Sequence, residues 1–248
     1  MQLISISEAT DRGALQWCAV RVALCLVFLL ALPLQAEPLQ GEAELGLVSI
    51  SGNSDARSLN AKLDISRGAG QWQQQVKFSL LHHVSSGRTT AEKYTAELQF
   101  DRGMDERQSL YWVASYEDDR FSGFAYQATS GLGYGYQWLN SEHQELKVEI
   151  GAGYRVNAPL SADKLHNITL RVAERYRRDL SETAELKQYL SVENGGGNTI
   201  VKWGVSLRSS LVGALALKMG VDVKYSTEVP PGIDRSDTES YATLSYRF

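Results

Sequence analysis

Residues 214–226 read Ala-Leu-Ala-Leu-Lys-Met-Gly-Val-Asp-Val-Lys-Tyr-Ser, and this stretch alternates apolar with polar or small side chains. Every second position from Leu215 to Tyr225 is apolar, whereas the positions between them include Lys218, Asp222 and Lys224. Side chains on a β-strand change face at every residue. The stretch therefore predicts a strand with one apolar face and one charged face.

The same alternation returns along the rest of the chain, separated by clusters of Gly, Ser, Asn and Asp. Twelve segments follow it: 42–51, 57–67, 72–84, 91–101, 108–118, 123–138, 144–156, 167–178, 185–194, 199–209, 214–226 and 238–248. Connections after even-numbered segments are short, and two after odd-numbered segments, 157–166 and 227–237, are long. We place Pro159, Pro230 and Pro231 in those two loops, so no segment contains a proline that would interrupt its ladder.

An even number of strands with short turns at one end is typical of bacterial outer-membrane barrels. A Lys or Arg on the lipid face costs about 2–4 kcal/mol at the bilayer midplane, so the apolar face is expected to point outward. Glu174 falls on that face, and we expect a bulge or a register error there. The prediction is an all-β, 12-stranded antiparallel up-and-down transmembrane β-barrel of the bacterial outer membrane.

Aromatic residues and the end of the chain favour a membrane barrel over a soluble sandwich. Trp and Tyr prefer the two membrane boundaries, and rings lie near predicted strand ends at Trp72, Trp112, Tyr116, Tyr126, Trp138, Tyr176 and Tyr225. The last segment ends with Leu244, Tyr246 and Phe248 at alternate positions. This pattern resembles the barrel-assembly signal of outer-membrane proteins, so we expect the barrel-assembly machinery, outer-membrane lipid and lipopolysaccharide as partners.

Residues 1–36 are predicted to be a cleaved signal peptide, which leaves 37–248 as one barrel domain. Arg12 and Arg21 precede the apolar run Val22–Leu32, which is too short to span a bilayer as a helix. Pro33 follows, and Ala36 offers a small residue for cleavage. Both cysteines, at positions 18 and 25, lie in this leader. The exported chain therefore has no disulfide framework, thiolate metal site or cysteine nucleophile.

Composition excludes two further classes of protein. Of the 248 residues, 43% are hydrophobic and 22% are charged, which are the proportions of a folded chain and not of a disordered one. The formal net charge is −4, and this argues against a nucleic-acid-binding protein. The expected location is the outer membrane of a Gram-negative cell, and a monomer is favoured.

The inward face of the predicted barrel carries fourteen basic and nine acidic side chains, an excess of five positive charges. The lumen-lining candidates are Lys147, Arg155, Arg171, Arg175, Arg177, Lys202, Arg208, Lys218 and Lys224. Rings of Lys or Arg favour anions in pores. Ion pairs that simply fill the barrel are the alternative, because twelve strands lie between barrels filled by side chains and barrels with an open channel.

Catalytic and metal sites are weakly supported by the sequence. His83 and Ser85 are two residues apart and share a face, which allows a serine–histidine lipid hydrolase as an alternative function. No acidic partner is apparent, and a polar strand end explains the pair more simply. The histidines lack metal-binding spacing. The loop acids Asp118, Asp119, Asp234 and Asp237 could bind the divalent cations that bridge lipopolysaccharide, but the simpler expectation is that they are only solvated. We predict no enzyme, no metal and no cofactor.

Four blocks resemble a bacterial family, the salt-induced outer-membrane proteins, also called domain of unknown function 481. The blocks are Leu45-Gly46 with Ser51-Gly52-Asn53-Ser54-Asp55, Tyr116-Glu117-Asp118-Asp119-Arg120-Phe121-Ser122-Gly123, Gly131-Leu132-Gly133-Tyr134, and Glu149-Ile150-Gly151-Ala152-Gly153-Tyr154. The resemblance implies a Gram-negative outer-membrane location and a link to salt or osmotic stress. It does not supply a substrate. We predict a narrow, anion-leaning pore or a structural envelope barrel.

The glycines of these blocks have a structural interpretation. Gly131, Gly133 and Gly135 alternate on the inward face of one predicted strand, and Gly151 and Gly153 on that of the next. Bare backbone on neighbouring strands leaves room for long side chains from nearby strands. Arg171, Arg175 and Arg177 are the expected occupants of that room.

Overall fold

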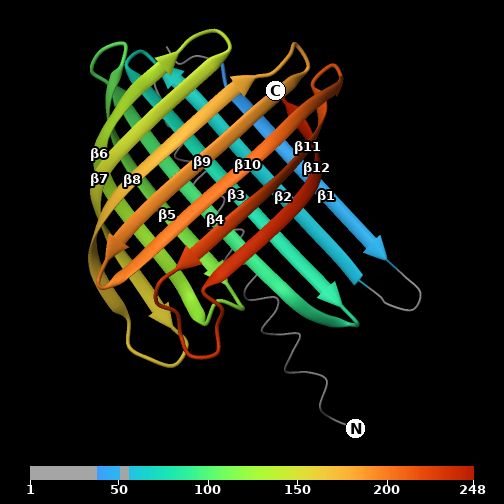
Figure 1. Cartoon of the computed structure of the whole chain (residues 1–248), viewed down its shortest axis with the longest axis vertical. Helices are drawn as coiled ribbons and strands as arrows, with labels where there is room; N and C mark the ends of the chain where they lie inside the picture. Colours follow the sequence, from blue (N-terminus) through green and yellow to red (C-terminus); the bar gives the residue numbers. More distant parts are fainter. Residues whose placement is uncertain (1–37, 51–55) are drawn as a thin grey trace. The chain divides into compact units, whose positions relative to one another are not determined.

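The computed structural model describes residues 38–50 and 56–248, and it shows a closed antiparallel barrel (Figure 1). The predicted leader, residues 1–36, and the motif at residues 51–55 lie outside the described residues. The strands are β1 (Gln40–Ile50), β2 (Ala56–Ala69), β3 (Trp72–Ser85), β4 (Arg88–Gly103), β5 (Gln108–Asp119), β6 (Phe124–Asn140), β7 (Gln144–Pro159), β8 (Leu165–Asp179), β9 (Ala184–Gly195), β10 (Asn198–Val212), β11 (Leu215–Ser226) and β12 (Ser236–Arg247). The predicted twelve-stranded barrel is confirmed.

Each strand pairs with its sequence neighbours, and β12 closes the barrel on β1. Gly41 and Phe248 exchange two backbone hydrogen bonds, of 2.9 and 3.0 Å, so the two ends of the barrel chain lie together. Turns after even-numbered strands lie at this end, and we call it the terminal end. The opposite end, where the longest described connection runs from residue 227 to 235, is called the loop end.

Most strands are longer than the alternation predicted. β4 begins at Arg88 instead of residue 91, and β7 continues to Pro159 instead of ending at residue 156. The placement of Pro159 in a loop was therefore wrong. A proline is tolerated there because it lies at the strand end beside a register shift between Phe124 and Tyr126 of β6, and prolines within sheets occur at such irregular positions. The next residue makes a backbone hydrogen bond between β7 and the start of β6, because the Leu160 N–H donates to the Gly123 carbonyl at 3.0 Å.

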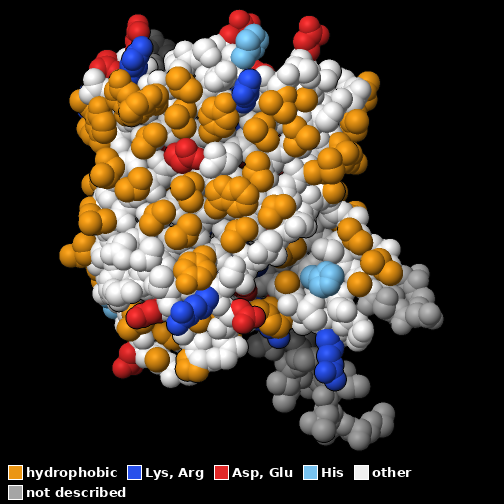
Figure 2. Space-filling model, viewed as in Figure 1, with side chains coloured by type: hydrophobic (Ala, Val, Ile, Leu, Met, Phe, Trp, Pro, Cys, Tyr) orange, Lys and Arg blue, Asp and Glu red, His pale blue; other side chains and the backbone are white. Residues whose placement is uncertain are grey.

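Apolar side chains cover the outer surface of the barrel in a broad band (Figure 2). On β8 the outward residues Ile168, Leu170 and Val172 are 78%, 67% and 50% exposed, while the inward Thr169 between them is 1% exposed. The largest fully buried side chains of the described residues are all polar: Arg155, Gln99, Glu149, Thr169, Thr243 and Ser245. This barrel is therefore polar inside and apolar outside, the reverse of a soluble protein. Among the described residues no helix is long and apolar enough to cross a membrane.

Tyrosine rings fill the space above four inward glycines of the described strands. A Cβ atom added to Gly133 or Gly151 would lie 2.5 Å from the side chain of Tyr111 on β5. Tyr189 covers Gly204 in the same way, and Tyr241 covers Gly220. The expectation that arginines of β8 occupy the space above Gly133 and Gly151 was wrong, because a flat ring from β5 packs on the bare backbone there. Arg171 instead donates a hydrogen bond of 3.2 Å to the Tyr111 hydroxyl.

Glu174 keeps its outward position without any bulge. β8 pairs in unbroken register with both neighbours, and Glu174 lies opposite Val148 on β7 and Leu190 on β9. The expected bulge or register error was therefore wrong. The Oε1 atom of Glu174 is buried and has no hydrogen-bond partner. A single acid is accommodated here because the regular ladders on both sides of β8 cost more to break than one polar atom does to bury.

We expect Glu174→Leu to raise the free energy of unfolding by about 1–2 kcal/mol, because it removes an unpartnered polar atom from an apolar surface. Urea unfolding in phospholipid vesicles, followed by tryptophan fluorescence, measures the change. Glu182→Leu, in the β8–β9 turn, is the matched control and should change stability little. A loss of stability in Glu174→Leu would contradict the prediction.

Candidate functional site: the ion-paired lumen

The inward side chains of β4, β7 and β8 form a central cluster around the carboxylate of Glu149. Glu149 is 1% exposed, and it accepts hydrogen bonds from Arg171 at 2.9 Å and from Arg175 at 2.7 Å. The Lys147 ammonium lies 3.3 Å from the same carboxylate and 2.5 Å from Asp101. Gln99 donates to Glu149 at 3.0 Å and accepts from Arg175 at 2.7 Å. Three cations therefore converge on one buried acid.

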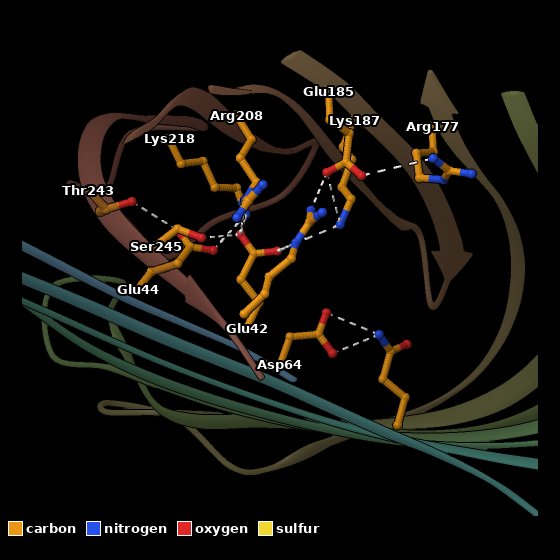
Figure 3. Close-up of polar contacts among 12 residues, drawn as sticks. Glu42, Glu44, Asp64, Arg177, Glu185, Lys187, Arg208, Lys218, Thr243 and Ser245 are labelled. Carbon is orange, nitrogen blue, oxygen red and sulfur yellow. Dashed lines mark hydrogen bonds and ion pairs between the residues drawn. The ribbon is translucent and has the colours of Figure 1, made fainter. Parts of the chain in front are cut away.

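A second group, the terminal cluster, joins the first and last strands at the terminal end (Figure 3). Glu42 accepts hydrogen bonds from Ser245 at 2.6 Å and from Arg247 at 3.2 Å. Glu44 accepts hydrogen bonds from Lys218 at 2.6 Å and from Thr243 at 3.0 Å. Further cations from β9 and β10 surround Glu42, namely Lys187 at 3.8 Å and Arg208 at 3.8 Å. Figure 3 shows these side chains converging from separate strands.

The third group, the cross-lumen cluster, connects opposite walls. Glu117 on β5 forms ion pairs with Lys202 on β10 at 3.3 Å and, more closely, with Lys224 on β11. Lys224 also donates to Gln127 on β6 at 2.9 Å. In the strand order, β5 and β11 are six positions apart in either direction around the barrel. Glu117 and Lys224 therefore span the lumen from one wall to the other.

This contact requires a flattened cross-section. Twelve strands spaced about 4.8 Å apart and tilted about 40° would enclose a circle roughly 24 Å across between backbones. An extended lysine and an extended glutamate joined by a hydrogen bond reach roughly 14 Å together. The walls that carry Glu117 and Lys224 must therefore approach each other by several ångströms, which makes the lumen narrow at this level.

The structure places all nine lumen-lining candidates on the inward face. Lys147, Arg171 and Arg175 meet in the central cluster, and Lys202 and Lys224 in the cross-lumen cluster. Arg208 and Lys218 belong to the terminal cluster. Arg177 forms ion pairs with Glu145 and Asp179 near the terminal end, and Arg155 with Glu193 in the wall.

The sequence analysis missed Glu42 and Glu44. Both were available from the pattern, since they alternate with Ala43 and Leu45 at the start of β1. Glu145 and Asp179 were missed in the same way, and both are partners of Arg177. With these four acids the positive and negative side chains of the lumen come close to balance.

In two ion pairs of the lumen, the positive partner is the more exposed one. The Lys202 side chain is 44% exposed against 9% for its partner Glu117, and Lys187 is 42% exposed against 10% for Glu42. In these two pairs the acid lies against the wall and the amine extends toward solvent. The Arg177–Glu145 pair near the terminal end is the reverse, because Glu145 is 46% exposed against 24% for Arg177.

The other candidate residues of the described chain lie outside these three clusters. Ser85 is the last residue of β3, next to the Ser86–Gly87 turn, and its hydroxyl makes no hydrogen bond with the His83 side chain. In the described part of the chain, no three His, Cys, Asp or Glu side chains are grouped to hold a metal ion. Leu244, Tyr246 and Phe248 point outward and are each about half exposed.

The family model described as protein of unknown function, DUF481, matches residues 43–248. The chain belongs to this family. The DUF481 chain is also 23% identical over 209 residues to a protein of Escherichia coli K12 described as uncharacterized protein YdiY. The alignment covers 84% of this chain and 82% of the relative.

A solved outer-membrane channel shares the fold of this DUF481 protein. The channel, from Pseudomonas putida F1, is 12% identical, with a TM-score of 0.50, over 88% of this chain and 97% of the channel. At this identity the likeness is one of fold alone, and it agrees with the antiparallel β-barrel predicted from the sequence. The NanC porin also matches, at 10% identity and a TM-score of 0.48, over 85% of this chain and 97% of the porin.

Proposed function

We propose that this DUF481 protein resides in the outer membrane of a Gram-negative cell and acts there as a narrow, anion-leaning pore. The apolar outer band and the similarity to outer-membrane channels support the location. Under this proposal the terminal end faces the periplasm, because bacterial barrels have their short turns on that side. The protein is a monomer in this proposal, and it contacts lipid and lipopolysaccharide. The barrel-assembly machinery recognises Leu244, Tyr246 and Phe248 and inserts the barrel into the membrane.

The proposed preference for anions rests on the exposure of two lumen lysines. A pore attracts the ion opposite in sign to the groups that water reaches. In the ion pairs around Glu42 and Glu117, the exposed partners are Lys187 and Lys202. The cross-lumen cluster supports a narrow conduit for ions and very small solutes. The proposed role is in the salt or osmotic response of the envelope, without catalysis, and this role rests on the family resemblance.

We expect the purified protein in planar bilayers to give small single-channel currents, with a reversal potential that indicates anion preference in a KCl gradient. The double variant Lys187→Gln/Lys202→Gln should lower the anion preference, because it removes two exposed ammonium groups of the lumen. Lys164→Gln, which removes an ammonium beside the Tyr126 ring at the loop end, is the control. Absence of current would refute the pore and leave a structural barrel, and cation preference would refute the selectivity.

A further inference from the structure

The seam between β1 and β12 is paired along less than half its length. The two strands pair only from Glu42 to Leu45, against Arg247 to Leu244, beside the Gly41–Phe248 backbone bonds. Yet β1 pairs with β2 all the way to Ile50, and β12 pairs with β11 from Ser236 onward. Both strands thus continue beyond the end of their shared ladder. In Figure 1 they meet near the C-terminus and diverge away from it.

The unpaired part of β1 carries exposed apolar side chains on both faces. The outward Leu47 is 70% exposed, and the next residue, Val48, is 54% exposed although its position belongs to the inward series of Glu42 and Glu44. Ile50, also in the inward series, is 52% exposed. The inward face is polar through most of the barrel, so these two residues replace polar lining by apolar lining where the seam is open.

A set of polar contacts lies on the lumen side of the opening, and we call it the seam latch. Asn60 on β2 donates to Glu239 on β12 at 2.6 Å. Lys62, also on β2, pairs with Asp222 on β11 at 2.8 Å, and its ammonium lies 3.6 Å from the Tyr241 ring centroid. The latch connects β2 to β11 and β12 past β1. A cation therefore lies just behind the apolar edge.

Closing the seam would need no change in the register of β1 and β12. Continuing the existing register would bring Leu47 opposite Ala242 and Val48 opposite Tyr241. Unpaired backbone groups exposed to lipid cost several kcal/mol each, and membranes tolerate them only where they line a water-filled cavity or protein. The unpaired backbone groups of β1 and β12 therefore fit a passage that holds water on its lumen side, and the two strands could pair to close it.

We propose that the unpaired part of the β1–β12 seam is a lateral opening through which a single-chain amphiphile with a carboxylate head passes between bilayer and lumen. The alkyl chain would contact Leu47, Val48 and Ile50, and the carboxylate would reach Lys62 in the latch. This inference rests on the proposed membrane location. It does not depend on ion conduction through the lumen.

Two matched cysteine pairs test the opening, because the described residues contain no cysteine. Leu47→Cys/Ala242→Cys would lock the seam closed, and the control Met219→Cys/Ala242→Cys links the same β12 residue to β11, where the strands already pair. Facing Cα atoms in an antiparallel ladder lie about 5.5 Å apart in hydrogen-bonded pairs and about 4.5 Å apart in the others, and a disulfide spans both separations. In proteoliposomes, uptake of dodecanoate and ion current are recorded for each oxidised and reduced barrel.

We expect the oxidised Leu47→Cys/Ala242→Cys barrel to lose dodecanoate uptake and a reductant to restore it, while the oxidised control pair keeps full uptake. Equal uptake in both oxidised barrels would overturn the proposal, as would no uptake in any barrel. Disulfide-linked dimers of Leu47→Cys alone would assign the edge to a second copy and also overturn it. Ion current separates the two proposals, since its absence in the unmodified barrel refutes the pore and leaves the uptake result standing.

The Lys62 ammonium provides a second test, of the head group. Lys62→Gln should reduce dodecanoate uptake by about threefold or more while leaving dodecanol uptake unchanged, because only the carboxylate forms a charge-assisted bond with the ammonium. Equal changes for both compounds would refute the assignment of the carboxylate to the latch.

Discussion

Glu149→Gln is expected to lower the free energy of unfolding by about 3 kcal/mol, a large share of the stability of a single domain. The substitution preserves the shape of the side chain and removes the charge that Lys147, Arg171 and Arg175 share. Three cations would then remain close together with too little negative charge between them. Urea unfolding in detergent micelles, followed by tryptophan fluorescence, gives the loss.

Glu145→Gln is the control for this result. Glu145 pairs with Arg177 at 2.9 Å, its side chain is 46% exposed, and Arg177 keeps a second partner in Asp179. Water already screens such a pair, so its loss should cost less than about 1 kcal/mol. Similar losses in the two variants would show that burial of Glu149 does not concentrate stability in the central cluster.

Glu117→Ser is expected to raise single-channel conductance by about two- to threefold and to strengthen anion preference. The serine is too short to reach Lys202 or Lys224, so the contact between opposite walls is lost and two ammonium groups face the lumen without their acid. Planar-bilayer recording measures both the conductance and the reversal potential.

Glu92→Ser tests whether loss of any acid has the same effect. Glu92 pairs with Arg120 at 2.9 Å near the loop end, away from the contact that crosses the lumen. Its loss should leave the conductance unchanged. An unchanged or smaller conductance in Glu117→Ser would mean that the cross-lumen cluster is not the constriction.

Residue alternation predicted most of the barrel because lipid and lumen impose opposite polarity on the two faces of every strand. Glu174 was the exception, and its expected bulge was wrong because two regular ladders hold β8 in register. The glycines of β6 and β7 were correctly assigned to packing, but the side chain above them was not. Tyr111 is distant in sequence from Gly151, and strand order alone does not show how far a ring extends across two neighbouring strands.

By itself the sequence determined the number of strands, their order and the face that each side chain occupies. These properties follow from local alternation and from turn lengths, because both are features of a single strand or hairpin and need no contact with the rest of the barrel. Only the tertiary structure decided which charges meet, because the Glu117–Lys224 contact depends on how far the barrel is flattened. The incomplete β1–β12 seam was likewise decided there, since that ladder joins the two ends of the barrel chain and no turn connects them.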